Sequence, residues 1–309
     1  MSLLTVGTVA FDAIETPFGK TDKIVGGAAT YIAWSASYFS KLVNIVSVIG
    51  DDFDMDELAA LQKRGVDTTG IEIKKGGKSF FWSGKYHLDM NTRDTLVTDL
   101  NVLLEFNPVI PQSYIDSDIL LLGNIDPSLQ MKVIDQLPKR PKLVVMDTMN
   151  FWMTENFVDK LHEVMKKVDV LAINDAEARQ LSGEYSLVKA ARKIMKMGPP
   201  YLIIKKGEHG ALLFHDRDVF FAPALPLEDV FDPTGAGDAF AGGFSGYLDK
   251  TRDISFENMK RAIIYGSAMA SFCVEKFGAE RLRNLTHHDI EERVKDFIDL
   301  VQFDIELED

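Results

Sequence analysis

Short apolar runs rich in Val, Ile and Leu recur along this chain, and they constrain its fold more than any other feature. The runs lack the apolar–polar alternation of a strand with one face in water, so both faces are expected to be buried. They comprise residues 3–6, 45–49, 119–122, 143–146, 168–173 and 202–204. Amphipathic stretches of helical length lie between them, at residues 56–64, 128–137, 155–167 and 186–197. This order predicts a three-layer, doubly wound α/β fold with a mainly parallel sheet.

The pattern becomes helical after Pro233. Apolar residues at helical spacing cover residues 236–248, 256–272 and 289–301. Thr286, with Asp289 three residues later, is typical of a helix N-terminus. The acidic residues beyond the last helix are expected to fray; they are Asp304, Glu306, Glu308 and Asp309.

Two segments interrupt the strand–helix rhythm and are expected to form a small β lid. They are residues 11–25, after the first strand, and residues 71–101, after the second strand–helix unit. The longer segment has a turn signal at Gly76-Gly77 and the aromatic residues Phe80, Phe81 and Trp82. Such an insertion covers the site, or forms a hairpin at an oligomer edge, or does both. A homodimer formed through the lid is therefore also expected.

Composition restricts the partners and the compartment. The 309 residues include 47 acidic and 34 Lys or Arg residues, and the net charge of −13 disfavours binding to nucleic acid or to an anionic membrane. The single Cys273 excludes an internal disulfide and fits a reducing cytosol. No apolar run reaches the roughly 18 residues of a membrane span, and no signal peptide follows Met1. We therefore expect a cytoplasmic protein.

One glycine-rich stretch carries more specific chemistry. Residues 231–243 read Phe-Asp-Pro-Thr-Gly-Ala-Gly-Asp-Ala-Phe-Ala-Gly-Gly, a loop that opens a helix of small residues. Glycines let backbone N–H groups turn toward one point, and the helix N-terminus adds partial positive charge, so the loop predicts an anion site. Asp238, in the first helical turn, is placed either to cap the helix or to accept a proton from a hydroxyl that attacks a phosphoryl group. These residues alone leave both roles open.

Together with four further motifs in the same order, this stretch resembles the C-terminal signature of the ribokinase-like (PfkB) carbohydrate kinases. The other motifs are Asp12, Gly26-Gly27-Ala28, Asn174 with Glu177, and Gly207 with Gly210. The resemblance covers about residues 3–285. It implies one ribokinase-like domain over residues 1–309 that transfers the γ-phosphate of ATP to an alcohol with Mg²⁺.

The resemblance also implies roles for these residues. Asp238 is the expected base, and the N–H groups of Gly235, Ala236 and Gly237 are expected to hold the developing charge. Substrate hydroxyls are expected at Asp12, Gly26 and Gly27, and the nucleotide at Thr234, Gly207 and Gly210.

Asn174 and Glu177 are expected to order Mg²⁺ through water. Plainer alternatives remain open: a polar pair at a helix start for Asn174 and Glu177, a β-turn for residues 207–210, and a turn residue for Asp12. Some members use a monovalent cation, here expected to be K⁺, and residues 277–279 indicate its place.

Several positions differ from the ribose-binding members or add to their pattern. Ala10 and Tyr31 replace Asn in the substrate pocket, which argues against a small polar pentose site. Lys205 replaces a Thr at the phosphate loop and adds a cation toward the phosphates. Asp147 and Asn150 follow a strand at the edge where ligands bind in open α/β sheets, so they belong either to the substrate site or to a helix cap.

Aromatic residues near the expected pocket can stack on a base or on a sugar face, or can simply pack in the core. They are Phe11, Tyr31, Trp82, Phe151 and Trp152. We therefore expect an ATP-dependent kinase for a sugar or sugar-like alcohol. A nucleoside kinase is the alternative, and a non-catalytic sugar or nucleotide sensor on the same fold is a second one.

Overall fold

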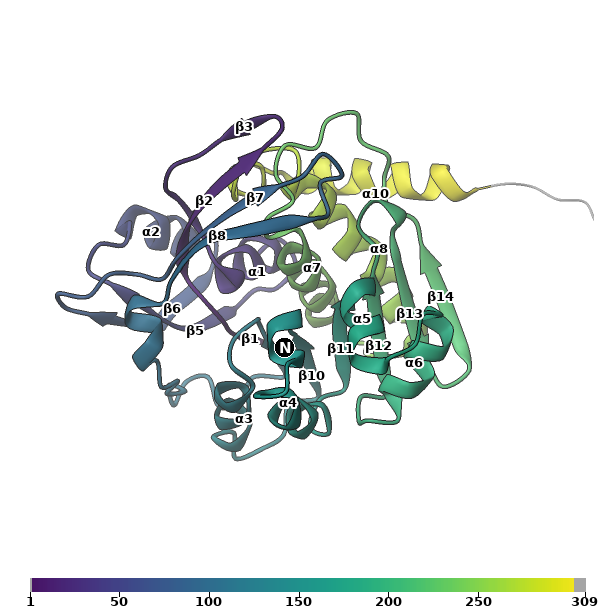
Figure 1. Ribbon diagram of the computed structural model, residues 1–309, viewed down its shortest axis with the longest axis horizontal. Helices are drawn as coiled ribbons and strands as arrows, with labels where there is room; N and C mark the ends of the chain where they lie inside the picture. Colours follow the sequence, from purple (N-terminus) through teal and green to yellow (C-terminus); the bar gives the residue numbers. More distant parts are fainter. Residues whose placement is uncertain (1, 303–309) are drawn as a thin grey trace, which may run out of the picture.

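A nine-stranded sheet forms the centre of the computed structural model, which describes residues 2–302 (Figure 1). The strand order is β14-β13-β12-β11-β10-β9-β1-β5-β6. The bounds are β1 (Leu3–Val6), β5 (Val43–Gly50), β6 (Val66–Lys74), β9 (Ile119–Leu122), β10 (Leu143–Asp147), β11 (Val170–Asn174), β12 (Tyr201–Lys205), β13 (Ala211–His215) and β14 (Asp218–Ala222). Pairings from β12 to β6 are parallel, and β13 and β14 add an antiparallel edge.

Helices cover both faces of this sheet (Figure 1). One face packs against α1 (Ala28–Ala36), α2 (Met55–Lys63), α7 (Ala236–Thr251) and α8 (Phe256–Cys273). The other packs against α3 (Pro127–Asp135), α4 (Val158–Met165), α5 (Asp175–Ser182) and α6 (Leu187–Met195). Short 3₁₀ turns lie at η1 (Asn101–Glu105), η2 (Asn150–Met153) and η3 (Gly207–His209).

The strands are apolar on both faces because both faces are buried. In β1, Leu3 belongs to the core beneath α1 and α7, whereas Leu4 and Val6 belong to the core beneath α3 and α4. All three side chains have no exposed surface. The predicted three-layer, mainly parallel fold is therefore confirmed. None of the helices in residues 2–302 has the length and apolar character needed to cross a membrane.

A smaller sheet is built from the two segments that interrupt the rhythm. Its strands are β2 (Ala10–Thr16), β3 (Gly19–Lys20), β4 (Ile24–Gly26), β7 (Phe81–Tyr86) and β8 (Arg93–Asp99). Their order is β3-β2-β7-β8, with β4 paired to β2, and β2 runs parallel to β7. One predicted boundary is wrong: residues 71–74 belong to β6 of the large sheet, because they pair with β5 up to Gly50 and Lys74. The second lid segment therefore begins after the turn at Gly76.

The outer strand of the small sheet, β8, is exposed along its whole length. Leu96 and Val97 have 55% and 40% of their surface exposed. An open strand edge with apolar side chains is suited to pairing with another chain. Dimerisation through the lid stays a prediction.

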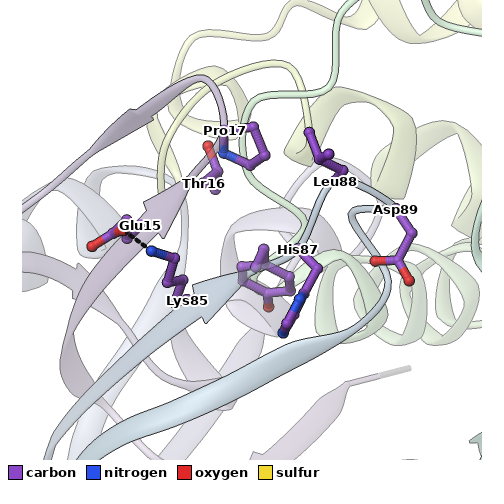
Figure 2. A pocket seen from close by; sticks show the side chains of 8 residues that line it. Glu15, Thr16, Pro17, Lys85, His87, Leu88 and Asp89 are labelled. Carbon is purple, nitrogen blue, oxygen red and sulfur yellow. Dashed lines mark ion pairs between the residues drawn. The ribbon is translucent and has the colours of Figure 1, made fainter.

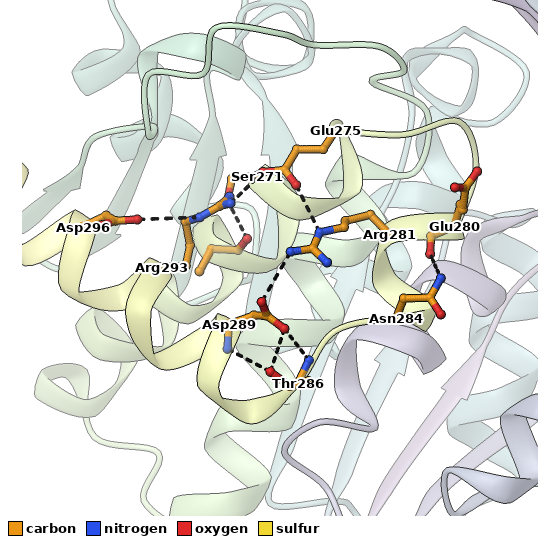
Figure 3. A network of polar contacts seen from close by, with 10 residues as sticks. Ser271, Glu275, Glu280, Arg281, Asn284, Thr286, Asp289, Arg293 and Asp296 are labelled. Atoms are coloured by element: carbon orange, nitrogen blue, oxygen red, sulfur yellow. Dashed lines mark hydrogen bonds and ion pairs between the residues drawn. The ribbon is translucent and has the colours of Figure 1, made fainter.

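Ion pairs fasten the C-terminal helix α10 (His287–Val301) to the turn that follows α8 (Figure 3). Arg293 of α10 contacts Glu275 at 2.6 Å. Arg281, in α9 (Glu280–Arg283), contacts Glu275 at 3.2 Å and Asp289 at 3.5 Å. Asp289 also forms the predicted helix cap with Thr286. The acidic tail that was expected to fray lies outside the described residues.

Candidate active site

The carboxyl ends of the central strands bring together the side chains that the sequence singled out. β1 has β5 on one side and β9 on the other, so the strand order reverses there, and ligands bind at such a switch point in open α/β sheets. Asp147 is the last residue of β10, and Lys205 is the last residue of β12. The N-termini of α5 and α7 lie at the same edge, next to these two residues.

The loop before α7 forms part of the predicted anion site. Gly235 has a φ of 77°, and a Cβ there would lie 2.4 Å from the ring of Tyr31, so only glycine fits. The N–H of Ala236 donates to the carbonyl of Pro233 at 3.2 Å. Among the described residues, no hydrogen bond is seen for the N–H groups of Gly235 and Gly237. These two groups are free for an anion, whereas the N–H of Ala236 is partly used within the loop.

Tyr31 lies beneath this loop instead of lining an open pocket. Its ring packs under Gly235, and only 1% of its surface is exposed. Burial raises the pKa of its hydroxyl well above its usual value. Tyr31 therefore supports the anion loop from below, and a direct contact with substrate stays a prediction that this burial does not favour.

Asp238 lies in the first turn of α7, as the motif predicted. Burial raises the pKa of its carboxyl to about 7, the nearby charge of Asp147 adds to this effect, and Lys205 and Arg93 oppose it. A carboxyl with a pKa near neutrality suits a general base, because it is ionised at working pH and still binds a proton well.

Lys205 makes an ion pair with Asp147, with 2.9 Å between Nζ and Oδ2. A Cβ on Gly237 would lie 3.0 Å from the same Nζ, so the ammonium group lies beside the start of α7. Lys205 thus adds a positive charge beside the loop that precedes α7. Asp147 holds this lysine in place, and its predicted contact with substrate stays a prediction.

Asn174 and Glu177 form a capping box at the start of α5. The side chain of Asn174 accepts from the N–H of Glu177 at 2.8 Å, and the side chain of Glu177 accepts from the N–H of Asn174 at 2.8 Å. The alternative of a polar pair at a helix start is therefore present in the structure. It uses only Oε2 of Glu177, so the second carboxylate oxygen is left for ordered water.

Asp12 lies against the two glycines at the start of α1. A Cβ on Gly26 would lie 1.9 Å from Oδ2 of Asp12, and the N–H of Gly27 donates to this carboxylate. Gly27 has a φ of 89° and leaves no room for a side chain, because a Cβ would lie 2.6 Å from the carbonyl oxygen of Thr8. Burial raises the pKa of Asp12 to about 7, and Asp232 and Asp238 add to this effect.

The predicted nucleotide loop is a tight turn between β12 and β13. Gly207 and Gly210 have φ values of 55° and 85°, and the N–H of Lys206 donates to the carbonyl of Gly210 at 2.8 Å. A Cβ on Gly207 would lie 2.3 Å from Oδ1 of Asn91 in the lid. The turn alternative is thus present, and the lid reaches this turn.

Three lid residues near the site were missed by the sequence analysis: Tyr86, Asn91 and Arg93. The hydroxyl of Tyr86 lies 3.1 Å from Oγ1 of Thr234 in the anion loop. Arg93, paired with Tyr86 across β7 and β8, lowers the pKa of Asp12, Asp238 and Glu177 through its charge. Their only sequence signal was their place in an insertion predicted to cover the site.

A pocket of about 520 Å³ opens behind Tyr86, between the turn after β2 and the end of β7 (Figure 2). The ion pair of Lys85 with Glu15, at 2.6 Å, closes one side of it. Its other lining residues are Thr16, Pro17, His87, Leu88 and Asp89. The pocket is lined by lid residues and adjoins the anion loop through Tyr86.

Residues 150–152, which follow β10, have no described contact with Asp238 or with the anion loop. Asn150 is exposed at the start of η2, and its backbone carbonyl accepts from Gln180. Phe151 and Trp152 pack edge to face at 5.0 Å, and the indole N–H of Trp152 donates to Asn124 at 2.8 Å. A substrate contact for Asn150 stays a prediction.

Comparison with known proteins identifies the family. The model of the pfkB family carbohydrate kinases matches residues 3–284. The chain belongs to this family. It is 33% identical over 254 residues to the cytidine kinase of Thermococcus kodakarensis, covering 80% of this chain and 88% of the relative. It is 26% identical over 303 residues to the nucleoside kinase of Methanothermobacter thermautotrophicus, covering 90% and 91%.

Solved structures agree with this assignment at the level of the fold. The nucleoside kinase of Methanocaldococcus jannaschii, described as an archaeal member of the ribokinase family, superposes with a TM-score of 0.76 at 20% identity. The match covers 95% of this chain and 98% of that one. The chain is thus a ribokinase-fold phosphotransferase that acts on a hydroxyl of a sugar or nucleoside. ATP is the phosphoryl donor that fits such a kinase, and Mg²⁺ is the metal ion that accompanies it.

Proposed function

We propose that this chain is an ATP-dependent nucleoside kinase in which Asp238 accepts the proton of the attacking hydroxyl. The observation that carries the proposal is the convergence of Asp12, Asp238 and Lys205 on the anion loop at the switch point of the sheet. Similarity to a cytidine kinase and to a nucleoside kinase over most of the chain favours a nucleoside over a free sugar. Ala10, which replaces a pocket asparagine of ribose-binding members, supports the same choice.

In this proposal the residues of the chain have three separate roles. Asp12 accepts hydrogen bonds from substrate hydroxyls and so places the acceptor oxygen against Asp238. Asp238 takes the proton of that oxygen as it attacks. The N–H groups of Gly235 and Gly237, with the ammonium group of Lys205, stabilise the negative charge on the phosphoryl group in flight.

The donor side fits ATP. Gly207 is exposed and leaves backbone where a phosphate chain can approach, while the buried Gly210 closes the turn beneath it. The second carboxylate oxygen of Glu177 suits a water bound to Mg²⁺. Bound Mg²⁺ supplies charge neutralisation for the phosphates. No group of three or more His, Cys, Asp or Glu side chains in residues 2–302 could hold a metal by itself, so Mg²⁺ would arrive with the nucleotide.

Asp232 lies between the anion loop and residues 277–279, where K⁺ is expected. Asp232 is fully buried, and its two carboxylate oxygens accept from the N–H groups of Thr234 at 2.8 Å and Gly278 at 2.9 Å. These bonds join the anion loop to residues 277–279. Both carboxylate oxygens of Asp232 thus already have backbone partners. Use of K⁺ stays a prediction.

ADP release across a panel of acceptors tests the proposed function. The panel contains cytidine, other nucleosides, free pentoses and hexoses, sugar acids and polyols, each with Mg-ATP. We expect a nucleoside to have the highest kcat/KM, and its turnover to depend on Asp238. A free sugar that exceeds every nucleoside would contradict the nucleoside assignment, while binding of ATP with no turnover of any acceptor would favour the sensor.

Glu177→Gln is expected to raise the Mg²⁺ concentration needed for half-maximal rate by about 10-fold. Gln keeps the capping box, because its amide oxygen can still accept from the N–H of Asn174, so only the charge near the metal is lost. The measurement is a Mg²⁺ titration of the rate at saturating nucleoside. Asp175→Asn is the matched control, since Asp175 is a partly exposed neighbour on the same helix that pairs with Arg179. An equal response of both variants would remove Glu177 from the metal environment.

A further inference from the structure

We propose that the indole of Trp82 is the surface on which the base of the substrate stacks, so that the lid selects a nucleoside by its planar ring. This inference rests on the proposed function, because it describes the acceptor end of the same site. It names the residue that distinguishes a nucleoside from a free sugar.

The indole of Trp82 lies flat on the small sheet. A Cβ on Gly84 would lie 2.1 Å from Cη2 and 2.4 Å from Cζ2 of Trp82, so the ring rests on the backbone of Gly84, where no side chain intervenes. Its Nε1–H donates to Oγ1 of Thr95 at 3.3 Å, which fixes the rotation of the ring in its own plane. Trp82 is only partly buried, whereas Gly84 beneath it is buried. One face of the indole is thus supported by the sheet, and Arg93 reaches over the ring from β8, so a base placed on this surface would meet the indole and the guanidinium group together.

The same face of the sheet carries the residues that meet the reacting groups. Trp82 pairs with Asp12 across the parallel strands β2 and β7, so both side chains leave the sheet on one side. Tyr86 lies four residues further along β7, on that same side, and its hydroxyl contacts Thr234 of the anion loop. Trp82 therefore lies on the same face of the small sheet as Asp12 and Tyr86, the residues that meet the site.

The surroundings of the indole suit the planar base of a nucleoside better than a sugar ring. The guanidinium group of Arg93 lies over the Trp82 ring, with Cζ 5.5 Å from the ring centre, so the indole has a cationic neighbour on its face. An indole offers a broad π face but no hydrogen-bond acceptor, and stacking on such a face is tolerant of which base is bound. A nucleoside bound with its hydroxyl at Asp238 has a base to place on this surface, and a free pentose has none.

Substitution of Trp82 separates this role from a structural one. Trp82→Leu is expected to raise the KM for cytidine by about 5- to 150-fold, the range found when a stacking aromatic residue is removed, with the KM for ATP within about 2-fold of wild type. Trp82→Phe keeps an aromatic face and is expected to restore most of the affinity. Val97→Ala is the matched control, because Val97 is exposed on β8 and pairs with Ser83, whose side chain points to the opposite face.

Binding without turnover gives a second readout. Cytidine is expected to quench the tryptophan fluorescence of the wild-type protein, ribose is not, and the quenching is expected to be lost in Trp82→Phe. An unchanged KM for cytidine in Trp82→Leu, or undiminished quenching in Trp82→Phe, would overturn this inference while leaving the nucleoside kinase intact. If wild-type protein phosphorylates free sugars and no nucleoside, the proposed function fails first and the stacking role fails with it.

Discussion

Asp238→Asn is expected to lower kcat by about 10²- to 10⁴-fold, the contribution typical of a general base. The amide has the same shape as the carboxylate but cannot take the proton of the attacking hydroxyl. ATP binding should stay within about 2-fold of wild type, because the base acts mainly in the transition state. ADP release at saturating nucleoside gives kcat, and titration calorimetry gives the affinity for ATP.

Asp249→Asn is the matched control for this variant. Asp249 lies on the same helix, and burial raises its pKa too, but it faces Ser40 instead of the anion loop. We expect it to retain wild-type turnover. Turnover of Asp238→Asn close to that of Asp249→Asn would refute the role of Asp238 as base.

The raised pKa of Asp238 also predicts an effect on stability. The folded protein binds this proton more tightly than the unfolded chain, with a pKa of about 7 against a usual value of 3.8. The stability it contributes is fully present below pH 3.8 and is lost as the pH rises through about 7. Asp238→Asn removes this loss, so its Tm relative to wild type should increase between pH 4 and pH 8. A Tm difference that does not change with pH would contradict the raised pKa.

Gly235→Ala is expected to lower kcat by about 100-fold or more, the effect of disturbing one donor of an anion hole. At a φ of 77° an alanine is strained, and its Cβ would lie 2.4–2.5 Å from three ring atoms of Tyr31. Because Tyr31 is buried, the loop must move instead, and its N–H groups then point away from the phosphoryl group. The measurement is kcat together with Tm, since strain should also lower stability.

Gly237→Ala provides the comparison within the same loop. The only atoms near a Cβ there are at the end of the flexible Lys205 side chain, with Nζ at 3.0 Å, and φ is ordinary for a helix. We expect less than about a 10-fold loss of kcat. Equal losses of kcat in Gly235→Ala and Gly237→Ala would show that contact with the Tyr31 ring is not what makes Gly235 necessary, and that Tyr31 does not support the loop.

The local pattern of residues was sufficient to predict the order of the main strands and helices. Strands buried on both faces must be apolar without alternation. Five of the six apolar runs lie within a strand of the large sheet, and the sixth, residues 168–173, overlaps β11 from Val170 onward. The antiparallel strands β13 and β14 were missed. β14 borders the sheet with exposed Val219 and Phe221, so it has no burial signal of that kind.

The motif near Asp238 was also recognisable without the structure, because a Gly-rich loop before a helix has the same local geometry wherever it occurs. What lies around it was not. Lys205 bonds Asp147 across 58 positions of the chain, and Tyr86 reaches Thr234 across 148.

Such contacts depend on which strands become neighbours and on how far the lid folds over the sheet. Neither is encoded in short-range spacing, which records only what a residue does within its own helix or strand. The sequence by itself therefore determined the layers, the anion loop and the candidate base. Only the tertiary structure decided that Tyr31 supports that loop, that Asp147 holds Lys205, and that Tyr86 and Arg93 of the lid lie beside the anion loop and Asp238.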